Sequence, residues 1–338
     1  MRTAIVGSSA FDSLEYNLWE TFTHLGHEAR IFGERDLIPF GGQARRAIAM
    51  LLDINSNCAR WAYQKLERRL LDYSADLIVV AYRHVIPDLI RSLKRQLPNT
   101  PIVQINPDAI SNLHRGYIFT SSYDAYFSKE PVLVDLMRKK LRLNAHYLPE
   151  SFNPRVHRRP AGDKARHEEE ANIDVVVAGT LYPYRIRFLE QLLEVLERRI
   201  TLALYGETRS WAQTPLWRYH RREVVTGERK AKAFYGARIV LDNMHWGEYQ
   251  GVNCRFFEAL GSGGFLLCDA RPSIPALATP GREVVTFESL EEAAERIRYY
   301  LDNDLERRSI SAAGYTRAIQ EHTYEHRIER MLSTIGLA

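Results

Sequence analysis

Short apolar segments alternate with helix-like segments along most of this chain, and that alternation constrains its fold more than any other feature. Strand-like segments fall at 3–8, 28–32, 76–82, 101–106, 124–129, 145–148, 173–180, 200–206, 237–243 and 264–270. Helix-like segments fall at 14–25, 43–72, 86–97, 131–141, 186–199, 229–236, 254–263 and 289–335. Short apolar strands separated by helices predict parallel sheets that are covered by helices on both faces. We therefore predict a protein of the α/β class.

A polar segment at 151–172 interrupts the alternation. It carries Pro154, Pro160, Gly162 and a mixed run of charges without an apolar period, so we expect a linker or surface loop. Because the alternation restarts after it, we predict two Rossmann-like, doubly wound domains that face each other across a cleft. The expected bounds are 1–150, 173–320 and a terminal helical segment at 321–338. In such sheets ligands bind at the carboxyl ends of the strands.

The composition excludes several classes of protein. Of the 338 residues, 45% are apolar and 26% are charged, which excludes wholesale disorder. The net charge of +4 is low for a nucleic-acid binder, so we expect no nucleic-acid partner. Charges occur in every window of about 18 residues, and Asp12 and Glu15 interrupt the start of the chain, so we expect neither a membrane span nor an export signal. The cysteines (Cys58, Cys254 and Cys268) are widely spaced, which favours reduced thiols in the cytoplasm.

The helix-like segment 43–72 carries six basic residues beside Trp61 and Tyr63. A basic amphipathic helix could make a peripheral contact with an anionic membrane. A helix that packs on the core and exposes a solvated basic face explains the same pattern.

The stretch 247–269 holds the strongest site pattern. Gly251 and Val252 lead into Asn253, a good N-cap residue, so a helix is expected to begin at Cys254. Such a helix start offers free backbone N–H groups to a pyrophosphate. Glu258 lies five residues past the cap, ~7–8 Å further along the helix axis, where a carboxylate can accept both hydroxyls of a ribose. Arg255, on the same face as Glu258, could orient that carboxylate or meet the phosphate, and an intrahelical ion pair on a surface helix is the alternative.

A second candidate is the loop from Gly179 through Thr180 and Tyr182 to Arg185, which follows the first strand of the second half. The loop lacks the GxGxxG spacing, so a dinucleotide fold is not indicated. An arginine at the mouth of such a loop is suited to bidentate binding of phosphate.

Several stretches together resemble a known family. They are VVAGTLYPYR, LALYG, GVNCRFFEALGSGGFLLCD, GREVVTFESLEEAAERIRYYL and EHTYEHRIERML, in that order. Over about 173–335 they are similar to the C-terminal domain of bacterial glycosyltransferases of the spore-maturation CgeB type. That family belongs with the GT-B-fold enzymes related to the retaining, group 1 glycosyltransferases. The resemblance implies an acceptor-side domain at 1–150, a nucleotide-sugar-binding domain at 173–320, and a terminal helix that returns across the domain junction.

The resemblance also implies roles for individual residues. Glu258 is similar to the family glutamate that holds the donor ribose, and Arg185 to the basic residue that meets the diphosphate. Gly251, Val252 and Asn253 correspond to the loop that approaches the phosphates or the sugar. Gly206 and the segment 224–230 would lie near the base. One departure is Gln250, which stands where relatives carry a glutamate that touches the donor sugar, and Glu248 is out of register for that role.

The activity implied is transfer of a sugar, typically a hexose, from a nucleotide-diphosphate sugar to a glycan, protein or small-molecule acceptor. The resemblance implies retention, with no metal and no further cofactor. If the reaction inverts, a base must project from the first domain. Asp108 is the first choice for that base, ahead of His84, His114 and Glu150. The alternatives are a non-catalytic nucleotide-sugar-binding protein, which Gln250 favours, and a GT-B-fold sugar epimerase.

Overall fold

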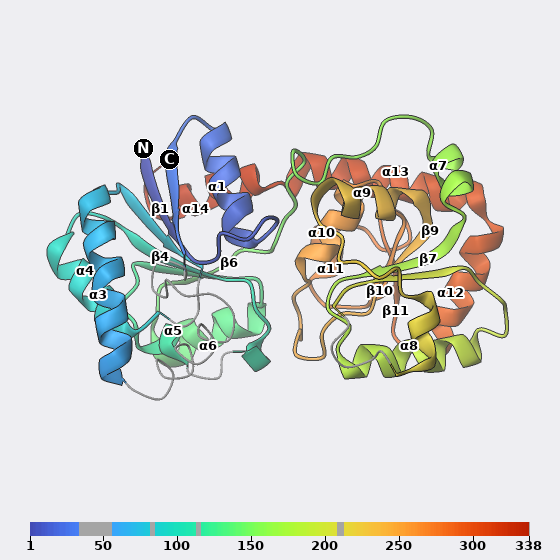
Figure 1. Cartoon of the computed structure of the whole chain (residues 1–338), viewed down its shortest axis with the longest axis horizontal. Coiled ribbons are helices and arrows are strands. Elements are labelled where there is room, and N and C mark those ends of the chain that lie inside the picture. Colours follow the sequence, from blue (N-terminus) through green and yellow to red (C-terminus); the bar gives the residue numbers. More distant parts are fainter. Residues whose placement is uncertain (34–55, 82–84, 113–115, 208–212, 338) are drawn as a thin grey trace. The chain divides into compact units, whose positions relative to one another are not determined.

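The computed structural model describes residues 1–33, 56–81, 85–112, 116–207 and 213–337 (Figure 1). The described chain forms two compact units. The N-terminal unit consists of Met1–Pro149 and Tyr324–Ala338, and the C-terminal unit of Glu150–Thr323. Both contain a parallel sheet with helices on its two faces (Figure 1).

The N-terminal unit has a six-stranded parallel sheet in the order β2-β1-β3-β4-β5-β6. Its strands are β1 Arg2–Val6, β2 Glu28–Phe32, β3 Leu77–Val80, β4 Ile102–Asn106, β5 Ala125–Ser128 and β6 Ala145–Tyr147. Its helices are α1 Leu14–His24, α3 Ser56–Tyr73, α4 Pro87–Gln96, η2 Ile110–Asn112, α5 Tyr117–Thr120, α6 Pro131–Leu141 and α14 Tyr324–Thr334. Each predicted strand of this half is present, with bounds that differ from the prediction by at most two residues at either end.

The C-terminal unit has a five-stranded parallel sheet in the order β11-β10-β9-β7-β8. Its strands are β7 Ile173–Ala178, β8 Leu202–Tyr205, β9 Ala237–Asp242, β10 Leu266–Asp269 and β11 Val285–Phe287. Its helices are α7 Lys164–Ala171, α8 Pro183–Val195, η3 Pro215–Tyr219, α9 Gly227–Gly236, α10 Cys254–Gly261, α11 Ile274–Leu277, α12 Leu290–Asp302 and α13 Asp304–Glu321. In this order β7 lies between β9 and β8. The loops that follow these three strands therefore lie side by side at the carboxyl edge of the sheet.

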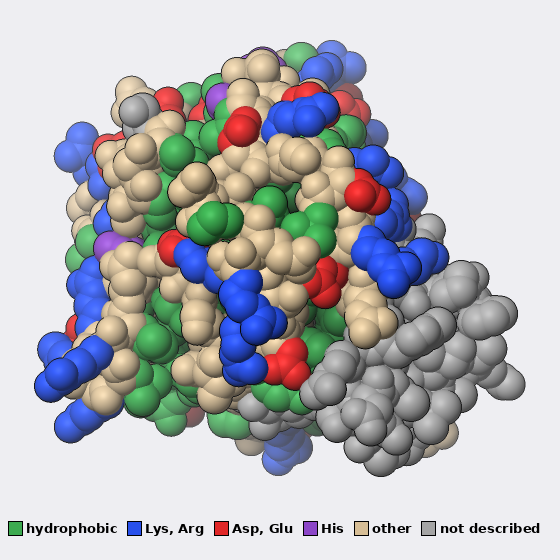
Figure 2. Space-filling view, turned by 90° about the vertical axis from the view of Figure 1, so that its left-hand side faces the viewer, with side chains coloured by type: hydrophobic (Ala, Val, Ile, Leu, Met, Phe, Trp, Pro, Cys, Tyr) green, Lys and Arg blue, Asp and Glu red, His purple; other side chains and the backbone are tan. Residues whose placement is uncertain are grey.

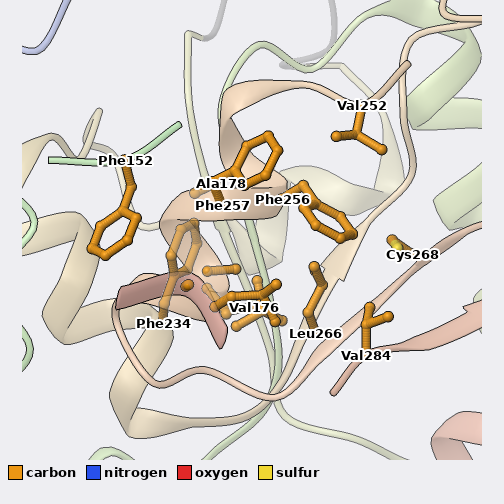
Figure 3. Close-up of a cluster of buried hydrophobic side chains, with 14 of the residues drawn as sticks. Phe152, Val176, Ala178, Phe234, Val252, Phe256, Phe257, Leu266, Cys268 and Val284 are labelled. Carbon is orange, nitrogen blue, oxygen red and sulfur yellow. The ribbon is translucent and has the colours of Figure 1, made fainter. Parts of the chain in front are cut away.

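Alternation along the buried strands divides each core into two layers. In β7, Val176 and Ala178 belong to one hydrophobic cluster, while Val175 and Val177 belong to the other. Successive side chains of a strand point to opposite faces, so a strand that is apolar throughout must be covered on both sides. Figure 3 shows the first of these clusters, in which Phe256 and Phe257 of α10 lie with Leu266 and Val284.

The segment 151–172, expected as a linker or loop, is built into the C-terminal unit. Phe152 is fully buried, and its ring lies so close to Gly261 that a Cβ added there would come within 2.3 Å. Helix α7 begins at an Asp163 cap and buries Glu168 against Arg307 and Arg308 of α13. The sequence of α7 shows no hydrophobic periodicity, because its buried face is held by ion pairs instead of apolar contacts. Strand β11 was also not predicted.

The last helix, α14, returns to the N-terminal unit. Tyr324, Ile328 and Met331 lie in the same hydrophobic cluster as residues of β1 and α1, and the Arg327 Nε donates to the Pro149 carbonyl at 2.9 Å. The contacts within that unit therefore include the terminal helix that the family resemblance implies.

Of the predicted helix 43–72, residues 43–55 lie outside the described residues. The described side chains of α3 bury Tyr63, Leu66 and Leu70 on one face and expose Lys65 and Arg68. Figure 2 shows the side of the molecule where α3 and α4 lie, with Lys and Arg side chains in several separate groups. A membrane contact through this helix stays a prediction. Among the described helices none combines the length and apolar character needed to span a bilayer.

Candidate functional site

Helix α10 begins where the sequence predicts. Asn253 is its N-cap, with extended backbone (φ −87°, ψ 171°), and its side chain accepts a hydrogen bond from the Phe256 N–H at 3.3 Å. Val252, Phe256 and Phe257 are buried in the core and hold the start of the helix in place (Figure 3). The first backbone N–H groups of the helix are thereby presented from a fixed position.

Glu258, one and a half turns further along α10, is part of a buried charge cluster. It is 5% exposed, and its Oε1 lies 3.0 Å from the Lys230 Nζ and 3.4 Å from the His157 Nε2. Lys230 comes from α9, in the segment 224–230 that the resemblance implies near the base. The carboxylate thus contacts a lysine ammonium group and a histidine ring, and it keeps oxygen lone pairs for further hydrogen bonds.

Arg255 does not pair with Glu258, so the intrahelical ion pair considered from the sequence is not formed. Its Nη1 instead lies 2.7 Å from the Asp242 Oδ1 at the end of β9. Burial opposes the charge of Arg255, but Asp242 holds the pKa of the guanidinium above its ordinary value. The guanidinium also lies against Gly179, where an added Cβ would come within 3.0 Å of Nη2 and where φ is +114°. The backbone at Gly179 therefore favours glycine, and a side chain there would also press on the Arg255 guanidinium.

Arg185 is the most deeply buried basic side chain of this edge, at 1% exposure. Its Nε donates to the Asn243 carbonyl at 2.8 Å and its Nη1 to the Thr180 carbonyl at 2.7 Å. Burial and the nearby Arg255 lower the pKa of its guanidinium. Arg185 thus ties the loop after β7 to the loop after β9. Its direct contact with a diphosphate stays a prediction.

Gly206, at the end of β8, lies against the same loop. A Cβ added there would meet the Gly179 carbonyl oxygen at 2.2 Å, a distance that no side chain tolerates. His220 contacts the Gly206 carbonyl through Nε2 at 3.0 Å. The ends of β7 and β8 can approach this closely because Gly206 has no side chain. The place of Gly206 beside the base stays a prediction.

Further side chains that the sequence did not single out fix the loop 243–253. The Tyr184 hydroxyl donates to the Met244 carbonyl at 2.7 Å, and the Asp269 carboxylate accepts from the Met244 N–H. Burial raises the pKa of Asp269 to about 6 and that of Tyr184 to about 12. The buried Glu248 accepts from the N–H of His245 at 3.2 Å, so it serves its own loop. Asp242 and Asp269 are the last residues of the buried strands β9 and β10. Because ligands bind at the carboxyl ends of such strands, this position in the sequence could have identified both as site residues.

Two more predicted residues, Gln250 and Tyr182, also lie at this edge. The backbone carbonyl of Gln250 accepts from the Ser273 N–H at 3.1 Å, and Tyr182 is the N-cap residue of α8, with 39% of its surface exposed.

The structure describes two of the four residues considered as a catalytic base in the first domain. Asp108 follows β4, where its N–H donates to the Asn106 Oδ1 at 3.3 Å, and its side chain is half-buried. His84 and His114 lie outside the described residues. Glu150 was expected in the first domain, but it belongs to the C-terminal unit. Glu150 is thus the first residue of the second unit, and its role as a base stays a prediction.

Comparison with solved structures identifies the fold. Sucrose-phosphate synthase from Thermosynechococcus elongatus superposes with a TM-score of 0.75 at 12% identity, covering 98% of both chains. Anabaena Alr3699/HepE in complex with UDP-glucose gives a TM-score of 0.72 at 12% identity over 100% of both chains. A glycosyltransferase from Rickettsia africae ESF-5 gives 0.68 at 10% identity over 98% and 97%. The chain has a GT-B fold.

A match to a family model covers most of the C-terminal unit, which contains the candidate site. A family model described as glycosyl transferase-like matches residues 185–333. Among curated proteins none matches the chain. The predicted fold class is confirmed, with parallel sheets of six and five strands.

Proposed function

We propose that this protein is a glycosyltransferase that moves a hexose from a nucleotide-diphosphate sugar, of the UDP type, to an acceptor. The glycosyl transferase-like match falls almost wholly within the C-terminal unit, where the buried carboxylate and the arginines gather. The structurally similar Alr3699/HepE was solved with UDP and with UDP-glucose. The CgeB-type subgroup is part of this proposal and rests on the sequence resemblance.

One observation carries the proposal: Glu258 is buried beside Lys230, ~7–8 Å along the helix axis from the Asn253 cap at the start of α10. That spacing suits a ribose and its diphosphate. The helix N-terminus would bind the diphosphate, and the Glu258 carboxylate would accept hydrogen bonds from the two ribose hydroxyls. The Lys230 ammonium group beside it offsets part of the cost of burying this carboxylate.

The chemical step breaks the bond between the anomeric carbon and the diphosphate oxygen. Negative charge then develops on the leaving diphosphate, next to the α10 N–H groups, Arg255 and Arg185. Groups fixed before the reaction stabilise such charge without reorganisation. In the retaining route, the acceptor oxygen attacks from the face that the diphosphate leaves. The departing phosphate oxygen takes the acceptor proton, so no strong protein base is needed.

A second candidate function is nucleotide-sugar binding without transfer. Gln250 favours it, because relatives carry at that position a glutamate that touches the donor sugar. The two functions differ in one measurable respect: a binder neither transfers nor hydrolyses the sugar.

The test is a melting screen with UDP, GDP, ADP and their glucose esters, followed by an assay for release of UDP from UDP-glucose. A ligand at 100 times its Kd stabilises the fold by about 2.7 kcal/mol, which a melt resolves. We expect UDP-glucose to stabilise the protein and to lose glucose slowly to water. Stabilisation without any release of UDP would support the binder. A melt unchanged by every nucleotide would refute both functions.

A further inference from the structure

A group of aromatic side chains lies exposed at the carboxyl edge of the C-terminal sheet. Tyr182 and Tyr184 come from the start of α8, and His245, Trp246 and Tyr249 from the loop after β9. We name these five residues the aromatic platform. Tyr182, Trp246 and Tyr249 expose 39%, 65% and 66% of their surface. Large exposed aromatic patches on a protein surface usually mark a binding site.

The rings of Tyr182, Tyr184, His245 and Trp246 pack on one another. Tyr182 and Tyr184 are near-parallel, with centroids 6.3 Å apart and planes inclined by 17°. The His245 ring meets them edge-on at 5.0 and 5.7 Å, and Trp246 lies 5.3 Å from His245. Offset and edge-to-face arrangements at such distances are the favourable ones for aromatic pairs.

The backbone below the platform is also fixed. Met244, directly before His245, is held through its carbonyl by the Tyr184 hydroxyl and through its N–H by Asp269. The Tyr184 hydroxyl is protonated at neutral pH, as any tyrosine is, and donates this bond throughout that range. A platform held in advance loses little conformational freedom when a ligand binds.

We infer that the aromatic platform binds a pyranose ring of the acceptor, which makes the acceptor a carbohydrate. This inference rests on the proposed function. One face of a pyranose presents C–H groups, which pack against the negative face of an aromatic ring, while its hydroxyls need polar partners. Gln250, next to Tyr249 in the same loop, supplies an amide that can donate and accept. An aromatic face beside an amide suits a sugar better than it suits a wholly apolar ligand.

Position separates this ligand from the nucleobase. The base is expected at the end of β8, by Gly206 and 224–230, whereas Trp246 follows β9. Strand β7 lies between β8 and β9, so their ends are about 10 Å apart across the sheet. Trp246 and Tyr249 instead share a loop with Gly251–Asn253, which the proposed function places at the diphosphate and sugar. A ring stacked on Trp246 would thus flank the donor sugar, where an acceptor must come.

The test uses saturation-transfer NMR with maltose, cellobiose and lactose, each in the presence of saturating UDP. We expect transfer to the ring C–H protons of at least one disaccharide. The variant Trp246→Ala should weaken that binding at least tenfold, and Trp246→Phe should keep it within threefold. Tyr299→Ala is the matched control, because Tyr299 is an exposed aromatic residue on α12 of the same unit, and it should bind as the wild type does.

The affinity for UDP, measured by calorimetry on the same variants, separates the two hypotheses. If UDP binds the Trp246→Ala variant normally while the disaccharide is lost, the inference is supported. If UDP weakens by the same factor, the platform stacks the base, and the inference is overturned. It is also overturned if no disaccharide receives transfer, or if Trp246→Ala leaves transfer unchanged. In these last two outcomes normal binding of UDP-glucose leaves the proposed function standing.

Discussion

Replacing Glu258 tests the proposed nucleotide site most directly, and the structure shows which replacement to use. The Glu258 side chain is 7% exposed and pairs with Lys230, whose side chain is 14% exposed. Deleting one partner of a buried ion pair typically costs 3–5 kcal/mol, since the other charge is left behind. Glu258→Ala is therefore expected to lower the melting temperature as well as the affinity. Glu258→Gln keeps the volume and an oxygen acceptor, so it disturbs the fold less.

The expected loss of affinity follows from the hydrogen bonds to the ribose. A bond to a charged group contributes about 1.5–3 kcal/mol and a neutral bond about 0.5–1.5 kcal/mol. Glu258→Gln should thus weaken UDP about 10-fold, and Glu258→Ala about 10- to 100-fold. The matched control is Glu295→Gln, which neutralises an exposed carboxylate on α12 and should bind UDP as the wild type does.

Isothermal calorimetry with UDP at 25 °C measures these differences, and a thermal melt of each variant measures the stability. An unchanged Kd in both Glu258 variants, together with a lowered melting temperature for the alanine variant, would refute the role at the ribose. Glu258 would then serve only to neutralise Lys230.

Three further predictions concern the surroundings of the site. The variant Arg185→Lys keeps a positive charge but cannot donate to the carbonyls of both Thr180 and Asn243. We therefore expect a lower melting temperature and, with UDP-glucose, a kcat reduced about 100-fold. A normal kcat would show that Arg185 takes no part in the reaction. Asp269 has its pKa raised from 3.8 to about 6, so its contribution to stability, about 3 kcal/mol, is present below pH 4 and lost as the pH rises through 6. The melting temperature of Asp269→Asn should therefore rise relative to that of the wild type as the pH increases from 4 to 7. A difference in melting temperature that stays constant over this range would contradict the raised pKa of Asp269. Gly206→Ala should destabilise the protein far more than Gly281→Ala, where φ is +78° but no atom lies within 4 Å; equal melting temperatures would show that the β7 and β8 ends can separate.

Features that depend on neighbouring residues in the chain were predictable. The Asn253 cap places the start of α10 at Cys254, and the apolar segments locate all strands of both sheets except β11. N-caps and alternation act within a few residues, so a single sequence displays them.

The partners of the charged side chains were not predictable. Arg255 lies three residues from Glu258 and yet pairs with Asp242, and Glu258 pairs with Lys230 on another helix. The two backbone carbonyls to which the Arg185 guanidinium donates, those of Thr180 and Asn243, were not foreseen either. Such pairs are set by which loops the strand order brings together, and the order β9-β7-β8 cannot be read from periodicity.

The return of α14 has a consequence for the order in which the protein is made. Tyr324, Ile328, Met331 and Leu332 complete a core that otherwise consists of residues from the first 148 positions. Domains usually fold as units while the chain emerges from the ribosome. Here the unit that is translated first would wait, with one hydrophobic face uncovered, until the whole C-terminal unit has been synthesised. The N-terminal unit is thus translated first but completes its core last. Its exposed hydrophobic face is the part of the nascent chain that a chaperone would bind.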